Sequence, residues 1–169
     1  MEQRAESGPE GTAFGFLTVV DSPTHGLFGG YLLVDGLGRP LEFHCTAPVK
    51  ISRAQQILYG STLHGHLHGR QIGATLLAEA TVTPSVVLTD HDALLQVRPH
   101  TSLPVVLARP LTDDPPPGCF TIGATSVAAP PGDADAAAIR GPLAELGAAI
   151  DLVEPFERIR AAIAEAQRH

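Results

Sequence analysis

The stretch AFGFLTVVDSPTHGLFGGYLLVDGLGRPLEFHCT, residues 13–46, decides the fold. It holds three apolar runs, at residues 13–20, 27–35 and 39–46, and the turn-forming segments DSPTHG and DGLG separate them. Apolar runs interrupted by Gly, Pro, Asp and Ser favour β-strands joined by short turns. The sequence therefore predicts a three-strand antiparallel meander at the start of the domain.

The third run alternates between apolar and polar residues. Leu41, Phe43 and Cys45 fall on one face of the expected strand, and Glu42 and His44 fall on the other. This period of two is typical of a strand with one buried face and one solvated face. We therefore expect the first three side chains to face the core.

The apolar pattern changes from a strand period to a helix period after Pro48. Ser52 is a suitable N-cap for a helix over residues 53–59, because its hydroxyl can accept a hydrogen bond from an amide of the first turn. Apolar residues within 62–79 recur at three- and four-residue spacing. This segment is expected to form a long or kinked helix.

Three glycines are regularly spaced in the second helical segment. Gly65, Gly69 and Gly73 lie four residues apart and would form a stripe without side chains on one side of a helix. Such a stripe allows another backbone to approach closely, although each glycine costs up to about 1 kcal/mol of helix stability relative to alanine. The alternative is that part of this segment is a loop.

The elements that follow alternate between strand and helix. Residues 85–89 and 103–109 are expected to be short buried strands, residues 90–98 a short helix, and residues 119–122 a last, edge strand. Alternation of this kind favours parallel pairing. The sequence predicts an α/β fold with a mixed sheet of about five strands, in which parallel strands follow the antiparallel meander.

The ends of the chain differ from its middle in composition. We expect a disordered tail over residues 1–11, an α/β core domain over 12–123, a linker over 124–133 and amphipathic helices over 134–169. The apolar residues of the last segment are spaced to lie on one helix face. These C-terminal helices are expected to cover either the core domain or another subunit.

The element order strand, strand, strand, helix, strand, helix, strand resembles the ribonuclease-H-like layout. The resemblance implies that the first and fourth strands lie side by side, so that Asp21 and Asp90 approach each other just past their carboxyl ends. Two carboxylates there could hold a divalent metal ion, as in a metal-dependent hydrolase or nuclease, with His91 or Glu79 completing the ligands. The alternative is that Asp21 opens a turn and Asp90 caps a helix.

A second metal hypothesis rests on the segment STLHGHLHG. On a helix, His64 and His68 share a face while His66 points away, so the first two could bind a transition metal. Such a pair needs a further ligand, and His44 and His91 are the candidates. The alternative is that these histidines are simply exposed and polar.

Recognition of a partner is the other function that the residues allow. A mixed polar set surrounds the connection between the third strand and the first helix, and the last helix begins with an aromatic residue that could anchor it on a partner. The candidate partner-binding residues are His44, Lys50, Arg53 and Phe156. The partner would be another protein or a second copy of the chain.

Composition limits the remaining function classes. The chain has 169 residues and 18 acidic against 11 basic side chains, a formal charge of −7, which argues against nucleic acid as a ligand. Two distant cysteines, no signal segment and no long apolar stretch predict a cytoplasmic protein without a membrane span. No cofactor other than a divalent metal ion is expected. The sequence predicts a cytosolic binding or assembly module for a protein partner or small ligand, with the metal-dependent hydrolase as the alternative.

Overall fold

A seven-stranded mixed sheet runs through the computed structural model, which describes residues 12–128 and 133–168. The strands are β1 (Ala13–Ser22), β2 (Gly26–Asp35), β3 (Pro40–Cys45), β4 (Val86–Thr89), β5 (Val105–Pro110), β6 (Cys119–Ile122) and β7 (Thr125–Ala128). Their order across the sheet is β3-β2-β1-β4-β5-β7-β6. The prediction of an α/β fold with a mixed sheet is confirmed, but the sheet has seven strands and not about five.

The predicted meander is present. β1 pairs antiparallel with β2, and β2 pairs antiparallel with β3. β1 also pairs with β4, and β4 with β5, and both of these pairs are parallel. The antiparallel strands β1 to β3 therefore form one half of the sheet, and parallel additions extend it from β1.

The predicted linker is partly wrong, because residues 125–128 form a strand. Gly123, at φ +59°, turns the chain so that β7 pairs antiparallel with β6 and inserts between β6 and β5. β6 remains the edge strand, as expected, but it is not the last strand. Residues 129–132 of the predicted linker, and the predicted tail over residues 1–11, lie outside the described residues.

The helical segments agree with the sequence in place but not always in type. They are α1 (Arg53–Tyr59), η2 (Gly60–Thr62), η3 (Gly65–Ala74), α2 (Thr75–Glu79), η4 (Asp92–His100), α3 (Asp133–Ala149) and α4 (Glu154–Gln167). Ser52 caps α1 in a reciprocal arrangement with Gln55. η3 is a π-helix and η4 is a 3₁₀-helix. No helix within the described part of the chain is long and apolar enough to cross a membrane.

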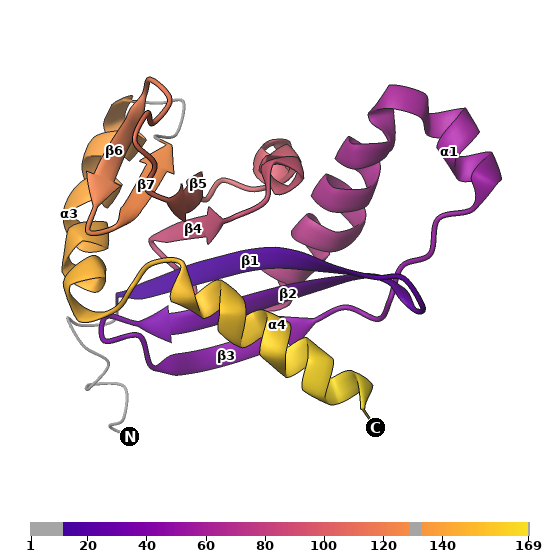
Figure 1. Cartoon of the computed structure of the whole chain (residues 1–169), viewed down its shortest axis with the longest axis horizontal. Helices are drawn as coiled ribbons and strands as arrows, with labels where there is room; N and C mark the ends of the chain where they lie inside the picture. The colour runs from indigo at the N-terminus through magenta and orange to yellow at the C-terminus, as the bar shows by residue number, and fades with distance from the viewer. Residues whose placement is uncertain (1–11, 129–132, 169) are drawn as a thin grey trace.

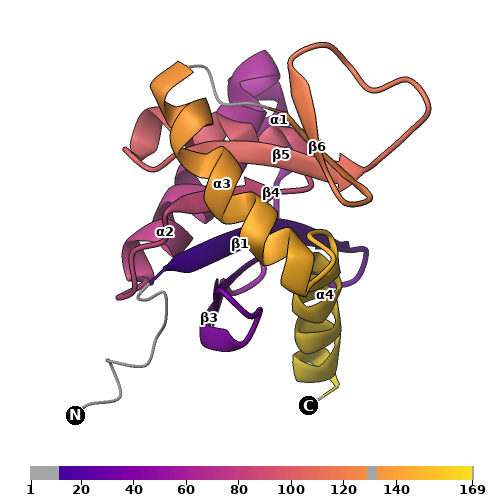
Figure 2. The same cartoon turned by 90° about the vertical axis from the view of Figure 1, so that its left-hand side faces the viewer.

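The two faces of the sheet are covered by different helices, as Figures 1 and 2 show. Phe14 and Phe16 of β1 belong to a core formed with α3 and α4. Leu17 and Val19 of the same strand belong to a second core, formed with η3, α2 and η4. The C-terminal helices therefore pack on the sheet of this chain and complete its core.

Two glycines of the stripe, Gly69 and Gly73, form a helix-packing surface, whereas Gly65 has room for a side chain. A Cβ on Gly69 would lie 2.5 Å from the carbonyl oxygen of Gln96, and one on Gly73 would lie 2.8 Å from Cγ2 of Val97. Both contacts are on η4, so η3 and η4 pack with their backbones unusually close. This closeness holds η4, and the residue His91 that precedes it, against the histidine-bearing part of η3.

Candidate functional site

A pocket of about 770 Å³ opens where β1 ends, beside His91, the second residue after β4. We call it the carboxyl-end pocket. Ligands of open α/β sheets usually bind beyond the carboxyl ends of the strands. Apolar residues form part of its lining, and its charged and nitrogen-bearing side chains are Asp21, Lys50, Gln56, His64, His68 and His91.

Four separate parts of the chain bring these side chains together. Asp21 is four residues beyond Leu17 on β1, so it points to the same side of the sheet as η3. Lys50 follows Val49, whose backbone pairs with Leu27 and holds the segment after β3 against β2. His64 lies just before η3 and His91 just before η4, and the packing of these two helices sets their separation.

The imidazoles of this pocket contact one another. His68 is buried, and its ring centroid lies 5.1 Å from that of His64. On its other side it stacks on His91, at 5.6 Å and an interplanar angle of 19°. Burial, followed by the neighbouring imidazoles of His64 and His91, lowers the pKa of His68 to about 4. The ring of His68 is therefore uncharged at neutral pH.

The middle histidine of the segment is not part of this group. His66 stacks on Tyr59 of α1, with ring centroids 4.4 Å apart and an interplanar angle of 17°. The Nδ1 atoms of His64 and His68, in contrast, lie 3.4 Å apart. The structure thus separates His66 from the other two, although the three residues lie within five positions of the chain.

Asp90 does not join Asp21 in this pocket. Its carboxylate accepts hydrogen bonds from Thr18 Oγ1 at 2.6 Å and from Arg160 Nη1 of α4 at 2.9 Å, on the face covered by the C-terminal helices. Leu17 is paired with Thr89 in the parallel register. Asp90 is one residue beyond Thr89, so it points to the face opposite that of Thr89 and Leu17. Asp21 is four residues beyond Leu17, so it points to the same face as Leu17. The two carboxylates therefore lie on opposite faces. The expectation that they approach each other is therefore wrong.

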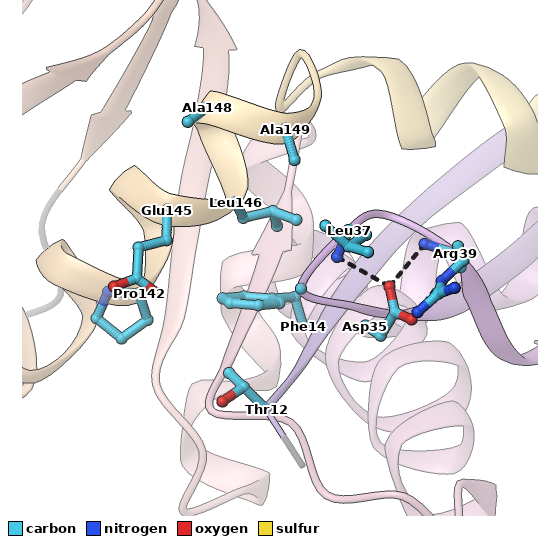
Figure 3. A pocket seen from close by; sticks show the side chains of 11 residues that line it. Thr12, Phe14, Asp35, Leu37, Arg39, Pro142, Glu145, Leu146, Ala148 and Ala149 are labelled. Atoms are coloured by element: carbon cyan, nitrogen blue, oxygen red, sulfur yellow. Dashed lines mark hydrogen bonds and ion pairs between the residues drawn. The ribbon is translucent and has the colours of Figure 1, made fainter. Parts of the chain in front are cut away.

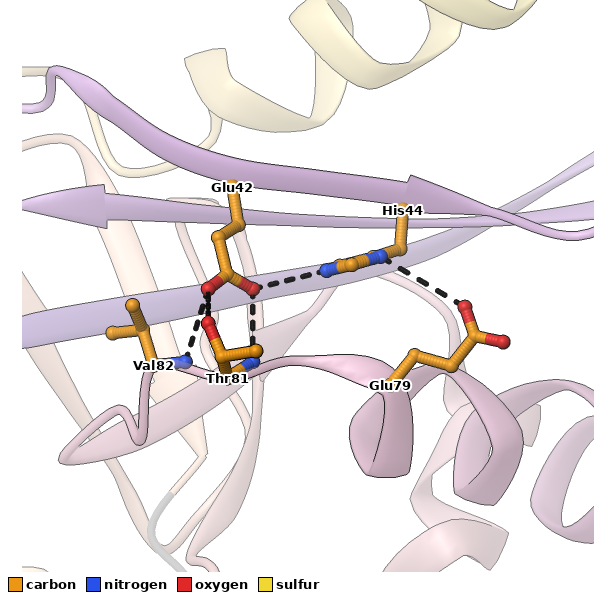
Figure 4. Close-up of polar contacts among 5 residues, drawn as sticks. All are labelled: Glu42, His44, Glu79, Thr81 and Val82. Atoms are coloured by element: carbon orange, nitrogen blue, oxygen red, sulfur yellow. Dashed lines mark hydrogen bonds and ion pairs between the residues drawn. The ribbon is translucent and has the colours of Figure 1, made fainter.

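The two other residues proposed to complete a metal site lie at the β3 edge of the sheet (Figure 4). His44 Nε2 donates to Glu42 Oε1 at 3.0 Å, and its Nδ1 lies 3.8 Å from Glu79 Oε1. Neither His44 nor Glu79 lines the carboxyl-end pocket. Glu79 contributes to the edge of the sheet, where it faces the imidazole of His44.

Glu42 connects β3 to the segment that leads into β4 (Figure 4). Its carboxylate accepts hydrogen bonds from the Thr81 hydroxyl, from the Thr81 amide at 3.0 Å and from the Val82 amide at 3.1 Å. These bonds, the Thr81 hydroxyl first, together with His44 outweigh the effect of burial and lower the pKa of Glu42 to about 2. Glu42 is therefore a structural residue of this edge.

We expect Glu42→Gln to destabilise the protein by about 2 kcal/mol at neutral pH, because several hydrogen bonds to a carboxylate are weakened. The folded pKa of about 2 lies below the ordinary value of 4.5, so this stability is present above pH 4.5 and is lost as the pH falls through about 2. Urea denaturation at pH 7 and at pH 3 measures both effects.

The matched control for this prediction is Glu79→Gln. The Glu79 carboxylate is 57% exposed and lies 3.8 Å from its imidazole partner, so removing its charge is expected to change the stability by less than about 0.5 kcal/mol. Equal losses for the two variants, or a Glu42→Gln difference that grows at low pH, would contradict the assignment.

The candidate partner-binding residues are distributed differently from the expectation. Lys50 lines the carboxyl-end pocket, and Arg53 is exposed at the start of α1. His44 is half-buried between two carboxylates. Phe156 is fully buried and packs edge-to-face on Phe16, with ring centroids 5.4 Å apart. It therefore anchors α4 on the sheet of its own chain and is not available to a partner, which corrects the sequence-based prediction.

A second pocket, of about 520 Å³, lies between α3 and the turn that joins β2 to β3 (Figure 3). Two carboxylates line it, those of Asp35 and Glu145. Asp35 accepts hydrogen bonds from the amides of Leu37 and Arg39, each at 2.9 Å. The guanidinium of Arg39 also pairs with Asp35, at 2.9 Å. Asp35 is engaged in closing the turn, and Arg39 is the one nitrogen-bearing side chain among the described residues that line this pocket. The carboxyl-end pocket brings together five such side chains and is therefore the better candidate site.

The sequence analysis identified most of the charged and nitrogen-bearing residues of the carboxyl-end pocket but assigned them to different hypotheses. Their shared signal is position, because Asp21 is the penultimate residue of β1, Lys50 lies in the segment after β3, and His91 lies just beyond β4. Within residues 12–128 and 133–168, no group of three or more His, Cys, Asp or Glu side chains is already placed to hold a metal ion. No protein-family model matches the chain, and a search of curated proteins finds no similar sequence.

Proposed function

We propose that this protein is a binding module whose carboxyl-end pocket holds a small acidic ligand. The observation that carries the proposal is the composition of the lining. Lys50, Gln56 and three imidazoles bring N–H donors to the pocket, against one carboxylate, Asp21, among the described residues that line it. Donors of this kind favour a carboxylate or phosphate group on the ligand.

The position of the pocket supports the same conclusion. It lies at the carboxyl ends of the adjacent parallel strands β1 and β4, where open α/β sheets commonly bind ligands. Its lining also contains the buried apolar residues Val19, Leu27 and Leu67. An apolar lining with a few polar groups is the usual composition of a small-molecule site.

A titration with two acidic probes tests the proposal. The ¹⁵N-labelled protein, treated with EDTA, is titrated with inorganic phosphate and separately with citrate. We expect shifts in the amides of residues 19–27 and 49–56, and a roughly tenfold loss of affinity in Lys50→Ala, because a charge-assisted hydrogen bond is removed. The stronger of the two probes identifies the acidic group that the pocket prefers.

Arg53→Ala is the matched control, since it removes a nearby exposed cation that does not line the pocket. Its affinity for both probes is expected to equal that of the unmodified protein. Shifts spread over the whole surface, or equal losses in Lys50→Ala and Arg53→Ala, would show only nonspecific attraction of anions and would reject the proposal.

The metal-dependent hydrolase is the second function considered. The parallel pairing of β1 with β4 supports the ribonuclease-H-like layout on which this hypothesis depends. Its catalytic part is not supported, because Asp90 is engaged with Thr18 and Arg160 on the face opposite Asp21. The binding module therefore accounts better for the residues that the pocket contains.

A further inference from the structure

The separation of two ring nitrogens in the carboxyl-end pocket is informative. Nδ1 of His64 lies 3.4 Å from Nδ1 of His68. Hydrogen bonds from N–H groups are usually about 2.9–3.0 Å long, so this distance is long for a shared proton. Two imidazole nitrogens on one tetrahedral Zn²⁺, each about 2.0–2.1 Å from the ion, would lie about 3.3–3.4 Å apart.

The backbone that carries these histidines is also unusual. His64 directly precedes the ten-residue π-helix η3, which contains His68. π-Helices mostly occur as single turns within α-helices and are often found at functional sites. The close packing of Gly69 on Gln96 fixes this segment against η4, so the backbone beneath His68 is held firmly.

We propose that His64 and His68 bind one transition-metal ion such as Zn²⁺ through their Nδ1 atoms, with Asp21 as the third ligand. The proposal rests on the proposed function, because it places a metal in the same pocket. Asp21 lines the same pocket and its side chain is exposed there, so it is free to rotate toward the two imidazoles when the ion binds. Imidazole and carboxylate are ordinary ligands of zinc.

The remaining coordination position is open to solvent or to an acidic ligand. Three protein ligands with one open position are the arrangement of zinc sites that bind further molecules, whereas structural zinc sites are closed by four protein ligands. The metal and the acidic ligand of the pocket would then contact each other directly. Bound zinc is therefore expected to increase the affinity of the pocket for phosphate or citrate.

Calorimetric titration of the EDTA-treated, full-length protein with ZnCl₂ tests the site. We expect one ion per chain, a rise in melting temperature with zinc, and a shift of the Nδ1 resonances of His64 and His68. His64→Ala is expected to abolish binding at zinc concentrations that saturate the unmodified protein. Because His64 is exposed, this variant is expected to fold. Asp21→Asn is expected to weaken binding at least tenfold.

His66→Ala is the matched control. His66 is two positions from each of the two histidine ligands, but its ring stacks on Tyr59 instead. The zinc affinity of this variant is expected to be unchanged. Absence of zinc binding by the unmodified protein, or equal weakening by His66→Ala and His64→Ala, would overturn the proposal. The acidic probes are tested without metal, so a failure of the zinc titration leaves the proposed function standing, and a failure of the probes leaves the metal site standing.

Discussion

Phe156→Ala is expected to destabilise the protein by about 3–5 kcal/mol, the range found when a large aromatic side chain is removed from a core. The Phe156 side chain is 0% exposed and packs edge-to-face on Phe16, between α4 and the sheet. Ile159 of the same helix lies close over Gly30, so α4 is already seated near the sheet and has little room to move inward and fill the space. Urea denaturation followed by circular dichroism measures the loss.

Phe43→Ala is the matched control, since Phe43 is 40% exposed on the edge strand β3. Its loss is expected to be clearly smaller, at most about 2 kcal/mol, because Phe43 is already partly exposed to water and its removal leaves no enclosed cavity. If Phe156→Ala does not fold, Phe156→Leu keeps the comparison measurable, with a smaller loss of the same origin. A stability of Phe156→Ala close to that of Phe43→Ala would mean that α4 does not complete the core.

The meander could be predicted because its signals are local. Segments rich in Gly, Pro and Asp separate long apolar runs, and each turn needs only the residues between its two strands. β7 has no such signal, since it is four residues long and follows a two-residue turn. It is a strand because β5 and β6 lie on either side of it, which is a tertiary condition. That pairing cannot be derived from the local pattern of a single sequence.

The exposed face of β3 has a similar explanation. The alternation of Leu41, Phe43 and Cys45 with polar residues predicts a buried apolar face, yet all three side chains are exposed. α4 covers β1 and β2, where Gly30 allows Ile159 to approach closely, and it leaves the outer strand open. The period of a strand shows which residues share a face, but not which face a helix will cover.

The site was predictable in its residue types but not in its grouping. The helical spacing of His64 and His68 places them together, and this follows from the sequence alone. The separation of Asp21 from Asp90 depends on the register of β1 and β4, in which Leu17 is opposite Thr89. A shift of one residue in that register would have brought both carboxylates to one face. The choice between the two metal hypotheses was therefore a question of register.

Gly69→Ala is expected to destabilise the protein by about 1–3 kcal/mol or more, because the added methyl group would overpack a close helix contact. Its Cβ would lie 2.5 Å from the carbonyl oxygen and 2.9 Å from the carbonyl carbon of Gln96. These are backbone atoms of η4, so they cannot move aside as the end of a flexible side chain could. Thermal denaturation at neutral pH measures the effect.

Gly65→Ala separates this contact from the intrinsic effect of glycine on a helix. The nearest atom to its Cβ would be Oε1 of Gln96, at 3.7 Å, so the alanine fits and is expected to raise stability by up to about 1 kcal/mol. Opposite signs for the two alanine variants are the expected result, and equal signs would contradict the packing argument. Because His91 precedes η4 and stacks on His68, the shift of η4 in Gly69→Ala is also expected to separate these two rings, whereas Gly65→Ala is expected to leave them stacked.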